Sequence, residues 1–271
     1  MTISIVTPVY NGLPQIRRTL DSLARQSVPF EHLVMDACSP DGTGAVVKEY
    51  ANSYDVTLSS ERDEGVYDAV AKGFARTRGD ILAWLNAGDV YMPFTLALVQ
   101  WIFETYPDVD WITGIPGNYY EERDAICLDP FTPVYSQTAV RRGWHNGYWL
   151  SPLQQESSFW RRSLWDKAGG REVLLGKGRG KGYASDFQLW RRFAQHSRPR
   201  TVCSLLAAFA ITKGQISETF RQQYYQECGV SSPPAHPVRL LHFLWAIYSF
   251  LNARDTIKGH HLKARTAPRL P

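Results

Sequence analysis

Polar side chains follow four short apolar segments near the N-terminus, in positions where they could bind a ligand or a metal ion. They are Thr7, Tyr10 and Asn11 at the end of the first segment, Asp36 after the second, residues 61–63 after the third and Asp89 after the fourth. Carboxylates that are gathered in one place repel one another. Proteins tolerate this where the acids hold a metal ion or accept hydrogen bonds from a ligand. We expect all of these side chains to converge on one edge of a sheet.

Alternating strands and helices over the first 110 residues would position these side chains. Short β-branched runs predict strands, and apolar residues spaced by three or four predict helices. The expected strands are 3–9, 32–36, 56–59 and 80–85, and the expected helices are 14–26, 43–52, 66–78 and 92–104. This order is typical of an α/β, Rossmann-like, mostly parallel sheet that is flanked by helices, where ligands bind beyond the carboxyl ends of the strands. No GxGxxG or GxxxxGK[ST] loop is present, which argues against a dinucleotide fold or a P-loop.

Four sequence blocks within the first 90 residues resemble family 2 glycosyltransferases of the GT-A fold. The blocks are Thr-Pro-Val-Tyr-Asn at 7–11, Met-Asp-Ala-Cys-Ser-Pro-Asp-Gly-Thr at 35–43, Ser-Glu-Arg-Asp-Glu-Gly-Val-Tyr-Asp-Ala at 60–69 and Gly-Asp-Ile-Leu-Ala-Trp-Leu-Asn-Ala-Gly-Asp at 79–89. Weaker matches continue to about residue 220. The resemblance implies an inverting transfer of a sugar from a nucleotide diphosphate-sugar donor to an acceptor hydroxyl, with Mg²⁺ or Mn²⁺ as cofactor.

The resemblance also implies which residues bind the donor. The matching positions are Thr7, Pro8, Tyr10 and Asn11 in the first block, Asp36 as the acid that contacts the base of the nucleotide, and Asp63, Gly65, Asp68 and Lys72 near the donor. Other roles stay open for three of them. Tyr10 could pack at a strand end, Asp36 could cap its own turn, and Lys72 could be a solvated helix lysine.

Asp89 matches the last acid of the family's metal motif, from which this chain departs. Asn86 stands at the first acidic position and Gly88 at the next, so one carboxylate remains. Mg²⁺ is often held by only one or two carboxylates together with phosphate oxygens and water. The resemblance therefore implies a metal at Asp89 whose affinity without the donor is poor. The alternative role of Asp89 is to cap the helix expected at 92–104. The histidine that relatives often carry as a further metal ligand is missing from residues 211–217.

An acidic block at 183–193 resembles the part of the family that carries the catalytic base. Inverting transfer needs a group that takes the proton from the acceptor hydroxyl, and Asp186 matches that group. Asp186 also begins an amphipathic helix, where it could be only an N-cap. The segment 152–165 resembles the part that faces the donor sugar and the acceptor, with Gln155 and Glu156 as its polar candidates. These two residues could instead be a buried polar pair.

The loop at 176–182 alternates glycine with lysine or arginine. Such a loop could close over the donor diphosphate, or it could be solvated. We expect three regions in the chain: a nucleotide-sugar-binding half at 1–110, an acceptor-binding and catalytic half at 111–232, and a basic helical tail at 233–271.

Charge is divided unevenly between the two halves of the chain. Residues 1–140 carry a net charge of −10 and residues 141–271 carry +14. The tail contains an apolar segment at 238–251, too short to cross a bilayer, followed by five cations and one acid. It could lie on an anionic membrane, pack on the domain or form a homodimer. The cations match no nucleic-acid-binding motif, so we expect no nucleic-acid partner.

The absence of a signal-like N-terminus predicts a cytoplasmic protein, and a peripheral position on the inner face of the cell membrane stays open. Four scattered cysteines predict reduced thiols. We expect the acceptor to be a glycan or a lipid-linked glycan in cell-surface polysaccharide or glycolipid synthesis. The competing hypothesis is a non-catalytic module that binds a sugar nucleotide or a glycan, which the acids missing at positions 86 and 88 suggest.

Overall fold

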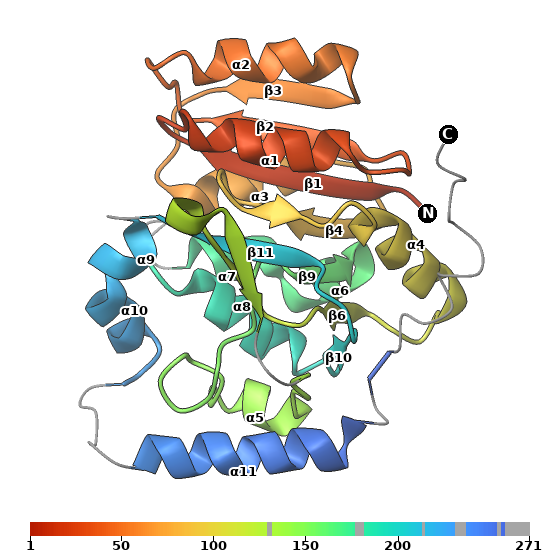
Figure 1. Ribbon diagram of the computed structural model, residues 1–271, viewed down its shortest axis with the longest axis vertical. Helices are drawn as coiled ribbons and strands as arrows, with labels where there is room; N and C mark the ends of the chain where they lie inside the picture. The colour runs from red at the N-terminus through yellow and green to blue at the C-terminus, as the bar shows by residue number, and fades with distance from the viewer. Residues whose placement is uncertain (129–131, 177–181, 213–214, 231–236, 254–255, 258–271) are drawn as a thin grey trace.

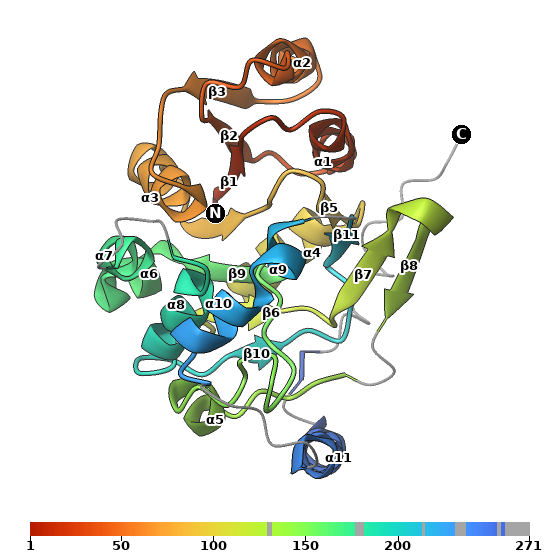
Figure 2. The same cartoon turned by 90° about the vertical axis from the view of Figure 1, so that its left-hand side faces the viewer.

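The computed structural model describes residues 1–128, 132–176, 182–212, 215–230, 237–253 and 256–257 (Figures 1 and 2). A central sheet runs through the molecule with helices on both of its faces, and a smaller sheet lies beside it. The α/β class and the mostly parallel sheet expected from the sequence are confirmed. Most of the glycine-and-cation loop lies outside the described residues, as does the tail beyond residue 257.

The central sheet has seven strands in the order β10-β6-β9-β4-β1-β2-β3. Neighbouring strands are parallel except for β9, which runs antiparallel to both β4 and β6. The strands of this sheet are β1 Ile3–Val9, β2 Glu31–Asp36, β3 Val56–Ser60, β4 Ile81–Trp84, β6 Trp111–Thr113, β9 Ser158–Arg161 and β10 Arg200–Thr201. The second sheet has the order β5-β11-β7-β8, with β5 Val90–Tyr91, β7 Gly117–Tyr120, β8 Ala125–Leu128 and β11 Ala207–Ile211.

The helices in the first half lie where the apolar spacing predicts them, within a few residues. They are α1 Gln15–Ala24, α2 Thr43–Glu49, α3 Val66–Arg76 and α4 Thr95–Thr105, with 3-10 turns at Tyr50–Asn52 and Glu121–Arg123. The later helices are α5 Gln137–Arg141, α6 Arg162–Ala168, α7 Gly170–Leu175, α8 Ser185–Phe193, α9 Ile216–Thr219, α10 Arg221–Glu227 and α11 Pro237–Leu251. The predicted helix at 43–52 therefore ends in a 3-10 turn, and the expected apolar tail segment forms α11.

Alternation along the strands divides the apolar residues between the two faces of the sheet. On β4, Leu82 and Trp84 join the cluster beneath α3, α6 and α8, whereas Ile81 and Ala83 join the cluster beneath α4. Successive side chains of a strand point to opposite faces, so a strand that is buried on both sides needs apolar residues at every position. All four residues of β4 are buried, as this arrangement requires.

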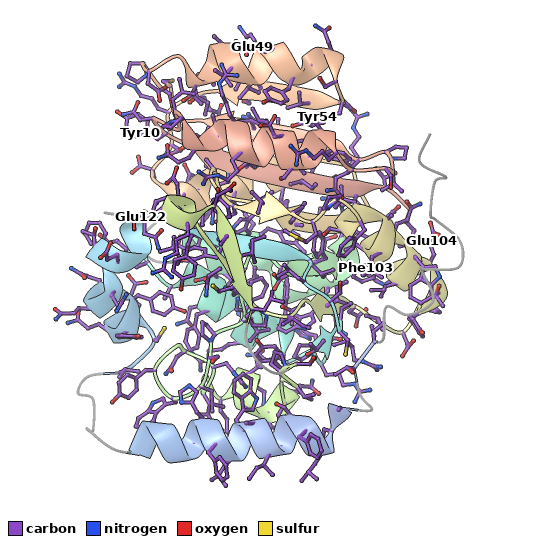
Figure 3. The ribbon with its side chains drawn as sticks, viewed as in Figure 1. Tyr10, Glu49, Tyr54, Phe103, Glu104 and Glu122 are labelled. Carbon is purple, nitrogen blue, oxygen red and sulfur yellow. The ribbon has the colours of Figure 1, made fainter. Side chains whose placement is uncertain are left out.

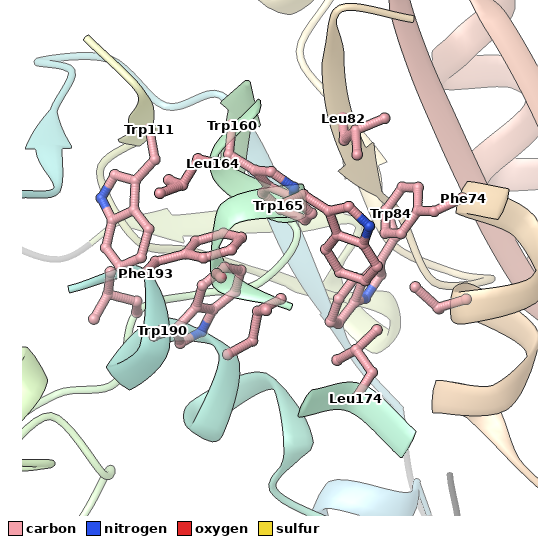
Figure 4. Packing of buried hydrophobic residues seen from close by; sticks show 14 of the residues in the cluster. Phe74, Leu82, Trp84, Trp111, Trp160, Leu164, Trp165, Leu174, Trp190 and Phe193 are labelled. Carbon is pink, nitrogen blue, oxygen red and sulfur yellow. The ribbon is translucent and has the colours of Figure 1, made fainter. Parts of the chain in front are cut away.

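Indole rings form the core on one face of the sheet and fix α8 against it (Figure 4). Trp190 of α8 stacks on Trp84 of β4 with ring centroids 6.3 Å apart. Its ring also lies edge-on to Trp160 at 5.6 Å and to Trp111 at 5.5 Å. Aromatic pairs of this kind contribute about 0.5–1.5 kcal/mol each beyond the area that they bury. The cluster therefore sets the position of α8, and with it the position of Asp186.

The long helix α11 packs through one side only. Its Trp245 is buried and donates from Nε1 to the carbonyl of Val134 at 3.0 Å, and the hydroxyl of Ser249 accepts from the Val134 amide at 3.0 Å. In the part of the chain that the structure describes, no helix combines the length and apolar character needed to cross a bilayer.

His32 of β2 is buried on the α1 and α2 side of the sheet and is held neutral there. Its Nε2 lies 2.9 Å from the hydroxyl of Thr7, and its Nδ1 lies 3.0 Å from the hydroxyl of Tyr54. Burial lowers the pKa of His32 from 6.5 to about 3. Below pH 6.5 the unfolded chain therefore binds a proton that the folded chain does not bind, and stability is lost as the pH falls.

We expect His32→Gln to weaken this acid sensitivity. The free energy of unfolding of the wild type should decrease more steeply than that of the variant between pH 6 and pH 4, by about 1.4 kcal/mol per pH unit. Urea unfolding at a series of pH values measures both slopes. Taking the difference between the two proteins cancels the contribution of every other titrating group. Parallel curves for the two proteins would contradict the prediction.

Candidate active site

The loops after β1 and β2 meet at the carboxyl edge of the sheet. Asp36 is buried, and its carboxylate accepts a hydrogen bond from the Ser39 amide at 3.1 Å and another from the Ser60 hydroxyl at 2.8 Å. The Asn11 amide donates to the Ser39 hydroxyl at 2.8 Å, so Ser39 joins the two loops. Tyr10 projects from the same edge with 63% of its surface exposed (Figure 3). This exposure excludes the alternative in which Tyr10 packs at the strand end.

Thr7 is not brought to this edge, contrary to the expectation from the sequence. Its side chain is fully buried, and its hydroxyl is bonded to His32 inside the layer. The physical reason is strand alternation, because Thr7 shares a face with Ile3 and Ile5 and so points toward α1 and α2. Pro8 is also buried, within the register of β1 and β2.

The start of α3 contains the next group of predicted donor residues. Asp63 accepts from the Gly65 amide at 2.9 Å, and Asp68 accepts from the Glu64 amide at 3.0 Å. The ammonium of Lys72 lies 2.8 Å from the Asp68 carboxylate and donates to the Arg62 carbonyl at 3.1 Å. Gly65 has a φ of 137°, in the region that favours glycine. The two contacts of Lys72 therefore hold its side chain against the loop before α3. Burial raises the pKa of Asp63.

Asp89 lies beyond β4 in a loop that α1 fixes in place. The Thr19 hydroxyl accepts from the Gly88 amide at 2.8 Å and donates to the Asp89 carbonyl at 2.9 Å. Only 3% of Asp89 is exposed; its Oδ1 accepts from the Ala210 amide at 2.8 Å, and its Oδ2 has no partner. The residue that caps α4 is Phe94, so the alternative role of Asp89 as a helix cap is excluded.

Asn86 stands beside Asp89 and is connected to the segment before β9. Its Nδ2 donates to Gln155 Oε1 at 2.8 Å, and its Oδ1 is buried without a partner. Gln155 in turn donates to the carbonyl of Trp84, so the loop after β4 and the segment before β9 are joined.

Two oxygens near the end of β4 suit a divalent cation. Asp89 Oδ2 and Asn86 Oδ1 are buried acceptors without partners, and Mg²⁺ and Mn²⁺ prefer oxygen ligands. Among the described residues, no group of three or more His, Cys, Asp or Glu side chains is arranged to hold a metal. The two oxygens thus fit a cation whose remaining ligands are phosphate oxygens and water. Burial raises the pKa of Asp89 to about 7.

Asp186 lies in the first turn of α8, where it does not act as the cap. The N-cap residue is Ala184, which makes no side-chain capping hydrogen bond, and Glu227 of α10 accepts from the amides of Tyr183 at 2.8 Å and Ala184 at 2.9 Å, just before the first turn. The Asp186 carboxylate instead accepts from the Tyr67 hydroxyl at 3.1 Å. Burial raises the pKa of Asp186, and the bond from Tyr67 opposes that rise. The N-cap alternative for Asp186 is therefore excluded.

Glu156 interacts electrostatically with both Asp89 and Asp186. It is 2% exposed, and its Oε1 has no hydrogen-bond partner. Burial raises its pKa well above the usual range, and the negative charges of Asp89 and then Asp186 raise it further. Asp89 and Asp186, which come from two other segments, are thus both close enough to Glu156 to raise its pKa. Gln155 and Glu156 are both buried, as in the alternative of a buried polar pair, and of these two only Gln155 has side-chain hydrogen bonds to the loop after β4.

Tyr67, Glu227 and Thr19 support this site and were missed by sequence reasoning. Each acts through a contact between segments far apart in the chain, which spacing does not reveal. The sequence did contain one signal: Tyr67 lies inside the 60–69 block, so it could have been considered as a hydrogen-bond partner of Asp186.

Comparison with known proteins identifies relatives of this chain. The chain is 39% identical over 164 residues to the poly(ribitol-phosphate) beta-N-acetylglucosaminyltransferase TarS of Staphylococcus aureus (strain MW2), covering 52% of this chain and 28% of that protein. The chain spans less than half the length of the curated relatives it matches.

Two solved structures share the fold. One is S. aureus TarS 1-349 in complex with UDP-GlcNAc, with a TM-score of 0.63 and 16% identity over 81% of this chain and 61% of that one. The other is the mannosyltransferase PcManGT from Pyrobaculum calidifontis in complex with GDP-Man and Mn²⁺, with a TM-score of 0.59 and 21% identity over 98% and 76% of the two chains. The expected GT-A fold is thereby confirmed.

A sequence model of one family matches residues 4–164, more than half of the chain, which contain the strand-end loops, Asp89 and Glu156. The chain belongs to glycosyl transferase family 2.

Proposed function

We propose that this protein is an inverting glycosyltransferase that moves a sugar from a nucleotide diphosphate-sugar donor to an acceptor hydroxyl. The observation that carries the proposal is the placement of Asp186. Its carboxylate is oriented by Tyr67 and lies at the same edge as Glu156 and Asp89. A single acid with a raised pKa, held in place by a neutral donor, suits a general base that works near neutral pH.

The reaction follows from this placement. The acceptor hydroxyl attacks the anomeric carbon from the side opposite the diphosphate, forming the new carbon–oxygen bond while the bond to the diphosphate oxygen breaks. The hydroxyl proton passes to Asp186, and the electron pair leaves with the diphosphate. Tyr67 keeps the Asp186 carboxylate oriented by donating to Oδ1. Glu156 would hydrogen-bond to a hydroxyl of the sugar or acceptor through its Oε1, which has no partner in the structure.

The donor would lie across the loops after β1, β2 and β3. Tyr10 offers an exposed ring for stacking on the base. Asp36 caps its own turn through the Ser39 amide and would contact the base from there. Lys72, whose ammonium pairs with Asp68, would lie near the diphosphate. Asn11, Asp63, Gly65 and Asp68 would shape these loops through their backbone contacts. The solved relatives in complex with UDP-GlcNAc and GDP-Man support a nucleotide-sugar donor.

Asp89 and Asn86 would hold the divalent cation, which when bound neutralises charge on the leaving diphosphate. The relative in complex with GDP-Man and Mn²⁺ supports this assignment. The named activity of TarS on poly(ribitol-phosphate) supports a cell-surface polymer or a lipid-linked glycan as the acceptor.

We expect Asp89→Asn to weaken binding of Mn²⁺ in the presence of UDP or GDP by at least about tenfold, because it replaces a carboxylate ligand by a neutral amide. The electron paramagnetic resonance signal of free Mn²⁺ measures this affinity without any need for turnover. Asp80→Asn is the matched control, since Asp80 precedes the opposite end of β4. If the two variants bound Mn²⁺ with equal affinity, the assignment of Asp89 as a metal ligand would be wrong.

A screen of nucleotide sugars tests the proposed function directly. Release of nucleoside diphosphate is measured with each donor, with Mn²⁺ and with EDTA, and the melting temperature reports binding in the same samples. A donor that raises the melting temperature and is turned over only with metal supports the proposal. Binding without turnover for every donor and acceptor tried would favour the non-catalytic module instead.

A further inference from the structure

The outer side of α11 is an apolar strip that no other part of the described chain covers. Its exposed side chains are Phe243, Leu244, Ile247, Phe250 and Leu251, of which Phe243 is 62% and Phe250 81% exposed. Their spacing places them on one face of the helix, opposite the anchored side that carries Trp245. Figure 3 shows side chains of α11 pointing away from the molecule. Contiguous exposed apolar residues of this kind mark a binding surface.

The segments around α11 are cationic and contain no acid. Residues 132–151, 191–206 and 237–253 include seven arginines but no Asp, Glu or Lys. Arg141 and Arg142 are exposed at the end of α5, and Arg142 lies over the exposed ring of Trp144 at 5.7 Å. The sequence that follows α11 adds Arg254, Lys258, Lys263, Arg265 and Arg269 against a single acid, Asp255.

A cavity of about 230 Å³ opens between α11, α5 and the segment that leads into β10. Tyr248 of α11 lines it together with Arg198, Arg200 and Thr201. Thr201 is 3% exposed and its hydroxyl has no partner, and Arg200 Nε is also buried without one. Guanidinium and hydroxyl donors around such a space suit a phosphate group.

We propose that α11 and the exposed end of α5 dock on an anionic phospholipid bilayer, with the cavity beside Tyr248 receiving a lipid phosphate. The apolar strip would enter the acyl boundary while the arginines meet anionic headgroups, and Trp144 would lie at the interface. A second copy of the chain fits this surface poorly. A two-fold contact through α11 would bring the same arginines of both copies together without an acid to oppose them.

The full-length protein is tested by sedimentation with vesicles of phosphatidylcholine alone and with about 30 mol % phosphatidylglycerol added. We expect binding only to the anionic vesicles, with a loss of at least about tenfold when the salt rises from about 0.1 M to about 0.5 M. Phe243→Ser with Phe250→Ser, and separately Arg141→Gln with Arg142→Gln, should each weaken binding at least about fivefold. Binding of Arg198→Gln to the same vesicles tests whether the cavity contributes, because Arg198 lines it.

Phe94→Ser is the matched control, because Phe94 is an exposed phenylalanine that caps α4 away from α11. It should bind vesicles like the wild type. Circular dichroism of each variant verifies that it is folded. Equal binding to both vesicle types, or no binding to either, would overturn the proposal. A dimer in light scattering that the double phenylalanine variant separates would also overturn it. No sugar transfer is measured, so this test is independent of the proposed function.

Discussion

Asp186→Asn is expected to lower the rate of sugar transfer by about 10²–10⁴-fold while leaving donor binding within about twofold, since a general base contributes that much and the donor nucleotide binds elsewhere. The amide oxygen can still accept the hydrogen bond from Tyr67, so the geometry of α8 should persist. It cannot take the acceptor proton near neutral pH. The measurement is kcat with a saturating donor, alongside the melting-temperature shift that the donor causes.

Asp166→Asn is the control for this prediction, because Asp166 is an exposed acid on the neighbouring helix α6. It should retain full activity. Tyr67→Phe adds a second readout: loss of its hydrogen bond raises the pKa of Asp186 further, so the acidic limb of the rate profile should move to higher pH. Near-normal transfer by Asp186→Asn with donor binding unchanged would show that another group is the base.

Trp190→Ala is expected to destabilise the protein by about 3–5 kcal/mol, the usual cost of removing a buried indole without refilling its space. Trp190 contacts the rings of Trp84, Trp111 and Trp160 and so holds α8 on the sheet. Urea unfolding followed by circular dichroism gives the free energy. Because α8 carries Asp186, transfer should also decrease at temperatures where the variant remains folded.

Two further variants serve as controls for the effect of Trp190→Ala. Trp190→Phe should cost less than Trp190→Ala because it keeps an aromatic ring in the cluster. Trp144→Ala, which removes an exposed indole, should cost less than about 1 kcal/mol. If Trp190→Ala and Trp144→Ala had the same free energy of unfolding, the indole cluster would not be the feature that holds α8 on the sheet.

The order of strands and helices in the first half could be predicted because each element carries its own period and its own turn residues. β1, β2, β3 and β4 lie where short β-branched runs end in polar loops. The antiparallel strand β9 and the second sheet could not be predicted in this way. Their pairing joins segments far apart in the chain, such as Trp160 with Leu82, and neither segment encodes its partner locally.

The site was predicted as far as residue types at strand ends allow. Asp36 and Asp89 lie in the positions after β2 and β4 that the sequence predicts, whereas the burial of Thr7 depended on which face of β1 its side chain occupies. The groups that hydrogen-bond to each acid come from elsewhere in the chain: the Tyr67 hydroxyl for Asp186, and the amide of Ala210 for Asp89. Such partners are determined by packing, which a linear pattern does not report.

The glycine in the shortened metal motif has an evolutionary consequence. Gly88 has a φ of +108°, and a Cβ there would lie 3.5 Å from Gln15 Cβ and 3.7 Å from Ala210 Cβ. Space is available for a side chain, but the backbone conformation penalises every L-residue other than glycine. Regaining the second acid of the motif by a single substitution would therefore distort the loop that presents Asp89. At position 88, therefore, the loop geometry and the side chain would have to change together, and a point mutation alone does not easily place an acid there.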